Sequence, residues 1–242
     1  MADKKKAFNR DKIKEVIRND IINAYHKRNK LPDFYSNTID IFGAVIDCKL
    51  LRINLDEWKK VEQPRQTQKT VQNVFGRLHQ TIIGTVDGWE DLGRQGTIVD
   101  VINRKRKIIC EIKNKHNTTK GNHKYAIYDD LDSLLKRNEY KNYIGYYVEI
   151  LPKNKKIYNE PFTPPDNRTS TRRKENKMIR KIDGKSFYEM VTGKEYAIRE
   201  LYLLLPKIVD EILVEEKIIS QKDGYSLVDN LIEEFYSKTF KY

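Results

Sequence analysis

The most constraining feature of the sequence is a pair of short apolar runs on either side of a polar turn. The first run, residues 97–102, is rich in β-branched side chains, and the second, residues 107–113, is equally apolar. Four polar residues, 103–106, separate them. Two such runs around a tight polar turn predict a β-hairpin. The fold must therefore contain at least one sheet, however helical its flanks are.

Helical periodicity surrounds this hairpin. We expect helices over residues 12–28, 37–51, 67–83, 129–138, 184–191, 194–214 and 229–240, a third strand over 143–151, and a proline-rich loop over 152–165. Gly84 is a plausible stop for the third helix, and Pro206 predicts a kink or a break. Strands set between helices indicate an α/β or α+β domain.

The length suits one domain. With 242 residues, we expect a single domain in three parts. These are a mainly helical N-terminal part (about 1–85), the hairpin (about 96–113) and a helical C-terminal part (about 184–242).

The charges on the hairpin follow the geometry of a strand. Side chains two residues apart on a strand point to the same face, so Glu111 and Lys113 project together. Cys110 and Ile112 then face the core. If the hairpin turns near residues 105 and 106, Asp100 comes opposite Glu111. The pattern D-x10-E-x-K thus predicts two carboxylates and one ammonium at a single place.

This group of side chains suits metal-assisted hydrolysis of a phosphodiester. Mg²⁺ prefers a few carboxylates together with waters and a phosphate oxygen. The ion offsets charge on the phosphate and lowers the pKa of a bound water. Lys113 would orient that water, help to deprotonate it or stabilise the transition state.

The acid-x-Lys triplet alone is weak evidence in a chain as charged as this one. Eight such triplets occur, and they start at Asp3, Asp47, Glu57, Glu111, Glu139, Glu175, Asp183 and Glu215. Only the triplet at Glu111 ends an apolar strand that follows another strand with an aspartate. The alternative is that these residues are solvated charges at the end of an ordinary hairpin.

The charge balance points to a polyanionic partner. The formal net charge is +12, and charged residues make up 34% of the chain. So large an excess of positive charge makes the molecule repel itself, and a soluble enzyme without a charged partner rarely needs it. Nucleic acid is the first choice of partner and an anionic membrane surface the second.

The sequence offers no support for a membrane role. The N-terminus lacks the apolar stretch of a signal peptide, and the longest apolar run, 201–205, is too short to cross a bilayer. Cys48 and Cys110 each lie in an apolar pattern and are expected to be small buried hydrophobes. We therefore expect a cytoplasmic protein in a reducing compartment.

Several motifs together carry a resemblance to a known family. Asp100 with Glu111-Ile112-Lys113 resembles the signature of the PD-(D/E)xK nuclease superfamily, with Val99 in the place of the proline. The continuation to Gly121, EIKNKHNTTKG, is similar to type II restriction endonucleases of the Eco-forty-seven type, which are related to enzymes that cut GGNCC. Further matches are Gly76, His79-Gln80, Gly84 and Gly88-Trp89, then Ile182 to Tyr188, Val191 to Gly193, and Leu205-Pro206. They extend from about residue 65 to 210.

The resemblance implies a mixed central β-sheet flanked by helices, Mg²⁺-dependent hydrolysis of double-stranded DNA and a homodimer. It assigns Asp100 and Glu111 as metal ligands and Lys113 as the catalytic lysine. Gln80, on the helix before the hairpin, is a further candidate near the metal, although an ordinary role on the helix surface or at its cap explains it equally well.

Two basic segments are the candidates for DNA contact. Residues 104–124 hold eight Lys or Arg against one acid, and residues 168–185 hold eight against two. Basic residues supply affinity for phosphates, whereas reading bases needs groups that reach a groove edge. The candidates are Asn114, Lys115, Asn117, Thr118, Thr119 and Lys120 after the catalytic strand, and Arg168, Arg172 and Arg173 in the loop-like stretch 167–173, the preferred recognition element. For each of these residues, a solvated charge or polar group is the simpler interpretation.

Three functional hypotheses fit these observations. The first is a type II restriction endonuclease that cuts a short palindrome as a dimer and needs a separate protecting methyltransferase. The second is a structure-specific repair or junction nuclease, and the third a non-catalytic basic DNA-binding module. An HNH nuclease built on His116, Asn117 and His123 is disfavoured by their spacing. No phosphate-binding loop or zinc cluster is found in the sequence.

Overall fold

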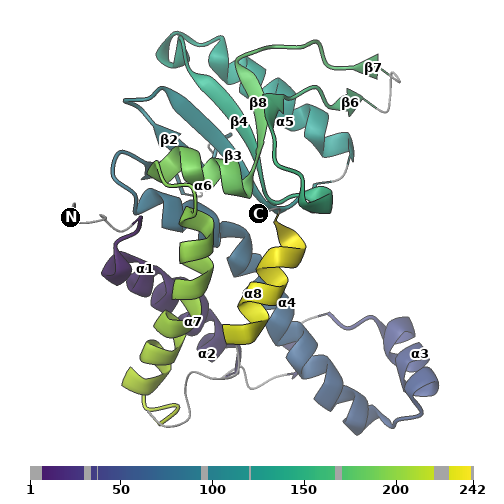
Figure 1. The fold of residues 1–242 in the computed structure, drawn as a ribbon. Coiled ribbons are helices and arrows are strands. Elements are labelled where there is room, and N and C mark those ends of the chain that lie inside the picture. Colours follow the sequence, from purple (N-terminus) through teal and green to yellow (C-terminus); the bar gives the residue numbers. More distant parts are fainter. Residues whose placement is uncertain are drawn as a thin grey trace. The chain divides into compact units, whose positions relative to one another are not determined.

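The computed structural model of the chain describes residues 7–29, 34–36, 38–93, 98–119, 121–166, 171–220 and 229–240 (Figure 1). The chain divides into two compact units. One unit comprises residues 1–16 and 79–242, and the other comprises residues 17–78. The single-domain organisation expected from the sequence stays a prediction.

The larger unit is built on a six-stranded mixed sheet with the strand order β1-β2-β3-β4-β8-β5. Its strands are β1 (Glu90–Asp91), β2 (Val101–Asn103), β3 (Ile108–Lys115), β4 (Ile144–Leu151), β5 (Asn159–Pro161) and β8 (Ile179–Asp183). The central strands β3, β4 and β8 are parallel, and the outer pairs are antiparallel. A separate pair, β6 (Pro165–Asp166) and β7 (Thr171–Arg172), forms a small ribbon. Parallel strands at the centre put the carboxyl ends of β3, β4 and β8 at one edge.

Helices cover both faces of this sheet. Helix α5 (Gly121–Leu135) lies against one face and α6 (Gly184–Thr192) against the other (Figure 1). The α5 side holds a buried cluster in which Leu131 and Tyr128 pack with Ile109 and Tyr147. Helix α7 (Ala197–Glu215) packs on α6, and α1 (Arg10–Val16) and α8 (Asp229–Thr239) pack on α7. The core is therefore a layer of aliphatic and aromatic side chains on each side of the three parallel strands.

The smaller unit is helical. It contains a π-helical segment η1 (Ile17–Ile22), α2 (Asn23–Asn29), a short 3-10 turn η2 (Phe34–Ser36), α3 (Ile41–Leu51) and the start of α4 (Leu55–Gly84). Helices α3 and α4 form a hairpin in which Trp58 is 5% exposed and its indole Nε1 donates to Asp47 Oδ2 at 3.3 Å. Helix α4 then continues into the larger unit, where it ends at Gly84.

The fold confirms the main elements expected from the sequence. The hairpin, the third strand and all seven helices are present, and Gly84 ends its helix as predicted. The mixed α/β sheet flanked by helices agrees with the restriction-endonuclease-like fold implied by the resemblance. Of the two cysteines, Cys110 is buried as expected, whereas Cys48 is only half-buried.

Several boundaries and two elements were wrong. Helices α4 and α5 begin well before residues 67 and 129, and Pro206 lies inside α7 without breaking it, so that only a kink at Pro206 stays a prediction. The expected loop 152–165 contains the edge strand β5, which tolerates Pro161 because an edge leaves one side unpaired. Strand β8 was missed because Arg180 and Lys181 interrupt its apolar pattern. None of the helices in the described part of the chain has the length and hydropathy that a membrane crossing requires.

Candidate active site

The hairpin has the register that the spacing predicted. Val101 pairs with Cys110 and Asn103 with Ile108, so the next pair along the ladder is Asp100 with Glu111. The main-chain N–H of Asp100 donates to Cys110 O at 2.8 Å. The N–H of Ile112 donates to the Asp100 carboxylate, at 2.7 Å from Oδ2. The Asp100 side chain thus continues the ladder where its backbone leaves the strand, and it is held facing Glu111.

Glu111 and Lys113 lie together on β3, on the α5 side of the sheet. Their side chains are 14% and 32% exposed, and Lys113 Nζ lies 2.5 Å from Glu111 Oε1. Cys110 and Ile112, which alternate with them, are buried on the opposite face, as expected for a central strand. The alternation along β3 therefore brings two carboxylates and one ammonium to one edge of the sheet and excludes the alternative of solvated hairpin charges.

Burial makes the two carboxyl groups resist ionisation. Burial and, next, the negative charge of Asp100 raise the pKa of Glu111 to about 7, against the attraction of Lys113. Burial also raises the pKa of Asp100, while its hydrogen bond from Ile112 N–H lowers it. The two carboxyls share a side-chain hydrogen bond that favours the proton on Glu111. With both carboxyls ionised, the pair would carry more negative charge than Lys113 alone balances.

Gln80 joins the end of α4 to this pair. It is 4% exposed, and its Nε2 donates to Asp91 Oδ1 at 2.7 Å and to the main-chain O of Asp100 at 3.3 Å. The other donor to Asp91 Oδ1 is the Gly93 N–H, at 2.7 Å. Gln80 is thus neither a solvated helix-surface residue nor a cap, because it braces the backbone that carries Asp100.

Sequence reasoning missed Asp91, which receives the hydrogen bond of Gln80. Its charge contributes to the raised pKa of Asp100. A Cβ atom on Gly84 would lie 2.7 Å from Asp91 Cβ, so α4 can approach β1 this closely only with glycine at that position. No spacing rule connects an acid on a two-residue strand with a glutamine eleven residues earlier, and the contact exists only in the tertiary structure.

The residues fit a hard divalent cation. Within the described ranges, no cluster of three or more His, Cys, Asp or Glu side chains is placed to hold a metal ion. Mg²⁺ requires fewer protein ligands than such a cluster, because it keeps several waters and binds through one or two carboxylates. Asp100 and Glu111 supply two carboxylates in contact, and both have raised pKa values that a nearby cation would lower.

A second carboxylate–lysine pair lies on the same face of the sheet. In the β3–β4 register Lys113 pairs with Glu149, a carboxylate that is 5% exposed. Lys124 Nζ from α5 lies 2.5 Å from Glu149 Oε1, and the Tyr158 hydroxyl donates to Oε2 at 2.6 Å. Sequence reasoning did not single out these residues, because the partners of Glu149 come from a helix and a loop.

Comparison with known proteins shows the family to which the chain belongs. The family model of the Eco47II restriction endonuclease matches residues 7–214. The chain belongs to the Eco47II restriction endonuclease family. It is 43% identical over 198 residues to the type II restriction enzyme Eco47II of Escherichia coli, with 81% of each chain covered. It is 29% identical over 208 residues to the type II restriction enzyme Sau96I of Staphylococcus aureus, with 85% of this chain and 77% of that enzyme covered.

Membership in the Eco47II family selects among the three functional hypotheses. The protein is a type II restriction endonuclease that cleaves double-stranded DNA site-specifically. The repair-nuclease and binding-module hypotheses are therefore set aside. The family match covers the hairpin that carries Asp100 and Glu111, and the whole of α4, which carries Gln80.

In this Eco47II-family protein, the candidate DNA contacts after β3 fall into two groups. Asn114 turns inward, because its side chain hydrogen-bonds to His79, whose pKa burial lowers to about 4. Thr119 is also buried, at 8% exposure. By contrast, Lys115 and Asn117 face solvent, and the hydroxyl of Thr118 donates to Lys115 O at 2.7 Å. Lys120 lies outside the described residues.

The exposed residues after β3 meet basic side chains from elsewhere in the chain. A pocket of about 540 Å³ is lined by Lys115, Asn117, Lys155 and Lys238, among others. Lys155 Nζ donates to Ser237 O at 2.7 Å, which ties η4 (Lys153–Lys155) to α8. The structure thus joins the end of the catalytic strand to lysines that sequence reasoning did not select.

The expected recognition stretch 167–173 is partly described. Arg168 falls outside the described residues, and Thr171–Arg172 form strand β7 where a loop was expected. Arg172 is exposed and its Nε donates to Thr163 O at 3.1 Å. Arg173 is engaged within the protein, since it pairs with Asp129 at 2.6 Å and with Asp166 at 3.4 Å. Of the two described arginines, Arg172 is therefore the more available to DNA.

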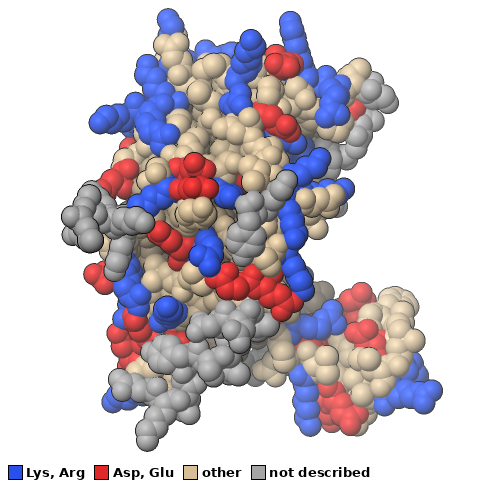
Figure 2. Space-filling model, viewed as in Figure 1, with Lys and Arg blue, Asp and Glu red and all other residues tan. Residues whose placement is uncertain are grey.

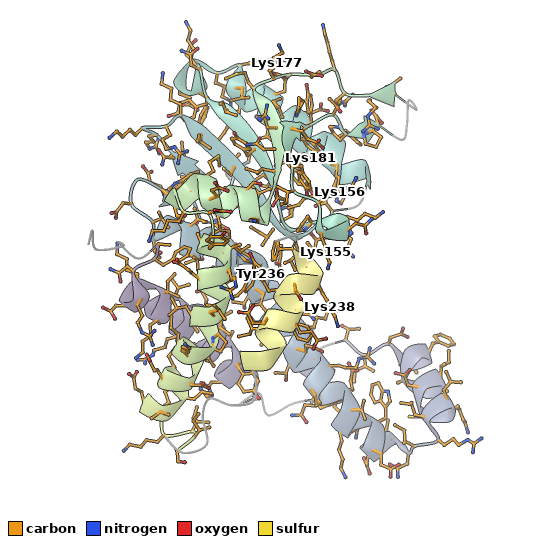
Figure 3. All side chains as sticks on the ribbon, viewed as in Figure 1. Lys155, Lys156, Lys177, Lys181, Tyr236 and Lys238 are labelled. Carbon is orange, nitrogen blue, oxygen red and sulfur yellow. The ribbon has the colours of Figure 1, made fainter. Side chains whose placement is uncertain are left out.

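Further lysines extend this basic surface. The lysines labelled in Figure 3 follow one another from the start of β8 across η4 to α8: Lys177, Lys181, Lys156, Lys155 and Lys238. In Figure 2 many Lys and Arg side chains project over the strands of the larger unit. Cations spaced along a surface in this way are suited to successive phosphates of a nucleic-acid backbone.

Proposed function

We propose that this restriction endonuclease depends on Mg²⁺, with Asp100 and Glu111 as metal ligands and Lys113 as the catalytic lysine. The observation that carries the proposal is the hydrogen bond of 2.7 Å from Ile112 N–H to Asp100 Oδ2, because it holds Asp100 opposite Glu111. When bound there, Mg²⁺ supplies a Lewis acid for the scissile phosphate and a water of lowered pKa. The role of the chain is to keep the two carboxylates converged.

Lys113 acts on the same edge. Its ammonium lies 2.5 Å from Glu111 Oε1, so it is already within reach of any group that binds at the carboxylate pair. Its hydrogens can be donated to a phosphate oxygen that gains charge in the transition state, or to the attacking water. With a third of its side chain exposed, Lys113 can turn towards the substrate without unfolding the strand.

Gln80 serves as a positioning residue in this proposal. It contacts Asp91 and the main chain of Asp100. It therefore acts through Asp100, by holding the backbone from which that carboxylate projects. Partners of metal ligands of this kind typically affect affinity or activity by about 10- to 100-fold.

DNA is held by the exposed basic groups near this edge. We place backbone contacts at Lys115 and Asn117, with the lysines of the adjoining pocket, and a base or backbone contact at Arg172. The target is a short palindrome, and the family resemblance suggests GGNCC. A homodimer matches the two-fold symmetry of such a site. The enzyme acts in the cytoplasm beside a cognate DNA methyltransferase.

The test compares the wild type with Lys113→Ala and with Lys141→Ala on phage DNA and Mg²⁺. Lys141 belongs to another acid-x-Lys triplet, but it is exposed in the turn before β4. We expect discrete bands from the wild type and from Lys141→Ala, and loss of cutting by at least ~10²-fold in Lys113→Ala. Equal cutting by both variants would remove Lys113 from the mechanism, and activity that survives chelation with EDTA would remove the metal.

A further inference from the structure

Helix α3 in the smaller unit exposes an unusual amount of apolar surface. Its most exposed side chains are Phe42 at 84%, Leu50 at 76% and Ile41 at 73%, and Val45, Ile46 and Leu51 are each more than half exposed. Among the eleven residues of this fully described helix, Ala44 is the buried one. An α-helix that is apolar on all sides is normally buried. Of the other exposed large apolar side chains of the described residues, Tyr35 and Leu55 lie beside α3, and most of the rest are scattered, which is ordinary for a protein surface.

The helix is firmly built, so its exposure does not reflect a loose segment. Asp40 caps its N-terminus by accepting from Gly43 N–H at 3.1 Å. Arg52 ends the helix in the left-handed conformation, and its main-chain N–H donates a hydrogen bond to Cys48 O. Asp47 is tied to α4 through Trp58 and Arg65, at 3.3 and 3.4 Å. A helix of this length has marginal stability alone, and these contacts present its apolar sides in a defined geometry.

We propose that α3 is the surface through which two copies of this chain associate. The six side chains exposed on α3 amount to roughly 600–1,000 Å², from ~150–250 Å² for a large side chain multiplied by its exposed fraction. Each partner buries about 800 Å² in a standard protein–protein interface. Monomers rarely leave contiguous apolar patches beyond ~300–600 Å² in water. The area is therefore sufficient for a stable dimer.

Charge favours a second copy over DNA as the occupant. The chain carries +12 overall, so two copies repel each other over most of their surface. Residues 38–51 hold only Asp40, Asp47 and Lys49 as charged residues, and much of the surface over α3 in Figure 2 shows no charged side chain. Phosphates would gain nothing from this surface. Association between two basic molecules is least opposed where their charge is lowest.

A groove beside α3 provides complementarity. Its volume is about 700 Å³, and Tyr35, Ile41, Val45, Leu55 and Trp58 are among its lining residues. Phe42 projects from the same helix, outside this lining. In a two-fold dimer each copy offers the same patch to the other, so Phe42 of one copy can enter the groove of its partner, and the exchange is reciprocal. Buried aromatic side chains of this kind dominate interface energetics.

This inference rests on the proposed homodimer and specifies its contact surface. The test is sedimentation equilibrium of the full chain, wild type against Phe42→Asp, with Phe235→Asp as the control. Phe235 is 59% exposed on α8, which belongs to the larger unit. We expect a dimeric wild type, a dimeric control, and at least a ~100-fold weaker dimer for Phe42→Asp, since each dimer contains the substitution twice.

Two further measurements keep the outcomes distinct. Leu50→Lys is a second variant on another turn of α3, and circular dichroism checks that each variant is folded. A monomeric wild type, as would occur if another part of the same chain covered α3, overturns the proposal. So does a result in which Phe42→Asp and Leu50→Lys are both folded and both stay dimeric. Lys113→Ala is measured alongside and should lose cleavage while remaining dimeric, so a failure of the catalytic assignment is seen separately from a failure of the interface.

Discussion

Two carboxylate–lysine pairs lie on the same face of the sheet, and they differ in what surrounds the carboxylate. In both pairs the ammonium nitrogen lies 2.5 Å from a carboxylate oxygen. Glu149 also receives the hydroxyl of Tyr158, so each of its oxygens has a donor. Glu111 instead faces Asp100, a second carboxylate. The Glu149–Lys124 pair is therefore electrically balanced. Glu111 and Asp100, by contrast, are two carboxyl groups that share the single ammonium of Lys113.

The difference distinguishes a structural ion pair from a functional one. Burial alone does not, because Glu149, at 5% exposure, is more buried than Glu111. A buried carboxylate with a cation and a neutral donor needs nothing further. Two buried carboxylates that share one lysine favour a proton or a further cation, as the raised pKa of Glu111 shows. The proposed catalytic pair therefore differs from the Glu149–Lys124 pair in the charge that a single lysine leaves unbalanced.

The same substitution should lower the cleavage rate strongly in one pair and only slightly in the other. We expect Glu111→Gln to lower the cleavage rate by about 10³-fold or more, because an amide cannot replace a carboxylate as a ligand for a hard cation. Glu149→Gln should stay within about 10-fold of the wild type, since it leaves the metal ligands in place. Initial rates on plasmid DNA measure both. A folded Glu149→Gln protein that is as inactive as Glu111→Gln would break the comparison.

For stability we expect the larger loss from Glu149→Gln and the smaller one from Glu111→Gln. Glu149→Gln leaves the ammonium of Lys124 without a counter-charge, in a site where the Lys124 side chain is 25% exposed. Because this exposure moderates the cost of a fully buried unpaired charge, we expect a loss of roughly 2–3 kcal/mol in the free energy of unfolding. Urea titration at pH 7.5 measures it. A loss below ~0.5 kcal/mol would mean that the pair is solvated like a surface pair.

The pH dependence of stability sharpens the comparison further, with the smallest expected effect. The folded pKa of Glu111, about 7, lies above the 4.5 that is usual for a glutamate in water. Its stabilising contribution is therefore complete below about pH 4.5 and is lost as pH rises through 7. In EDTA, the wild type should lose roughly 2 kcal/mol more than Glu111→Gln between pH 5 and pH 8. If the free energies of unfolding of the two proteins changed equally with pH across this range, the carboxylate pair would not carry the excess charge.

The hairpin shows how far the sequence alone could lead. Alternation along a strand is a local property, so the positions of Glu111, Lys113, Cys110 and Ile112 relative to the core followed directly from the spacing. The register that brings Asp100 opposite Glu111 also followed, because a short polar turn leaves little choice. The family motifs added the function and the expectation of a metal.

Other elements could not be predicted locally. Strand β8 carries Arg180 and Lys181 in the middle, and its identity as a strand comes from pairing with β4 and β5. Conversely, α3 was expected from its apolar spacing, yet that spacing does not place its apolar side chains in the core. Sequence periodicity predicts a helix but does not say what covers it.

The sequence by itself determined that this chain builds a hairpin with two carboxylates and a lysine, because local geometry allows few other arrangements of those residues. Only the tertiary structure decided that Gln80 and Asp91 brace Asp100, and that Tyr158 and Lys124 balance Glu149. Those contacts join segments that are distant along the chain, and their energies depend on burial and on neighbouring charge. Whether an acid is a ligand or a structural partner is therefore set by the fold around it.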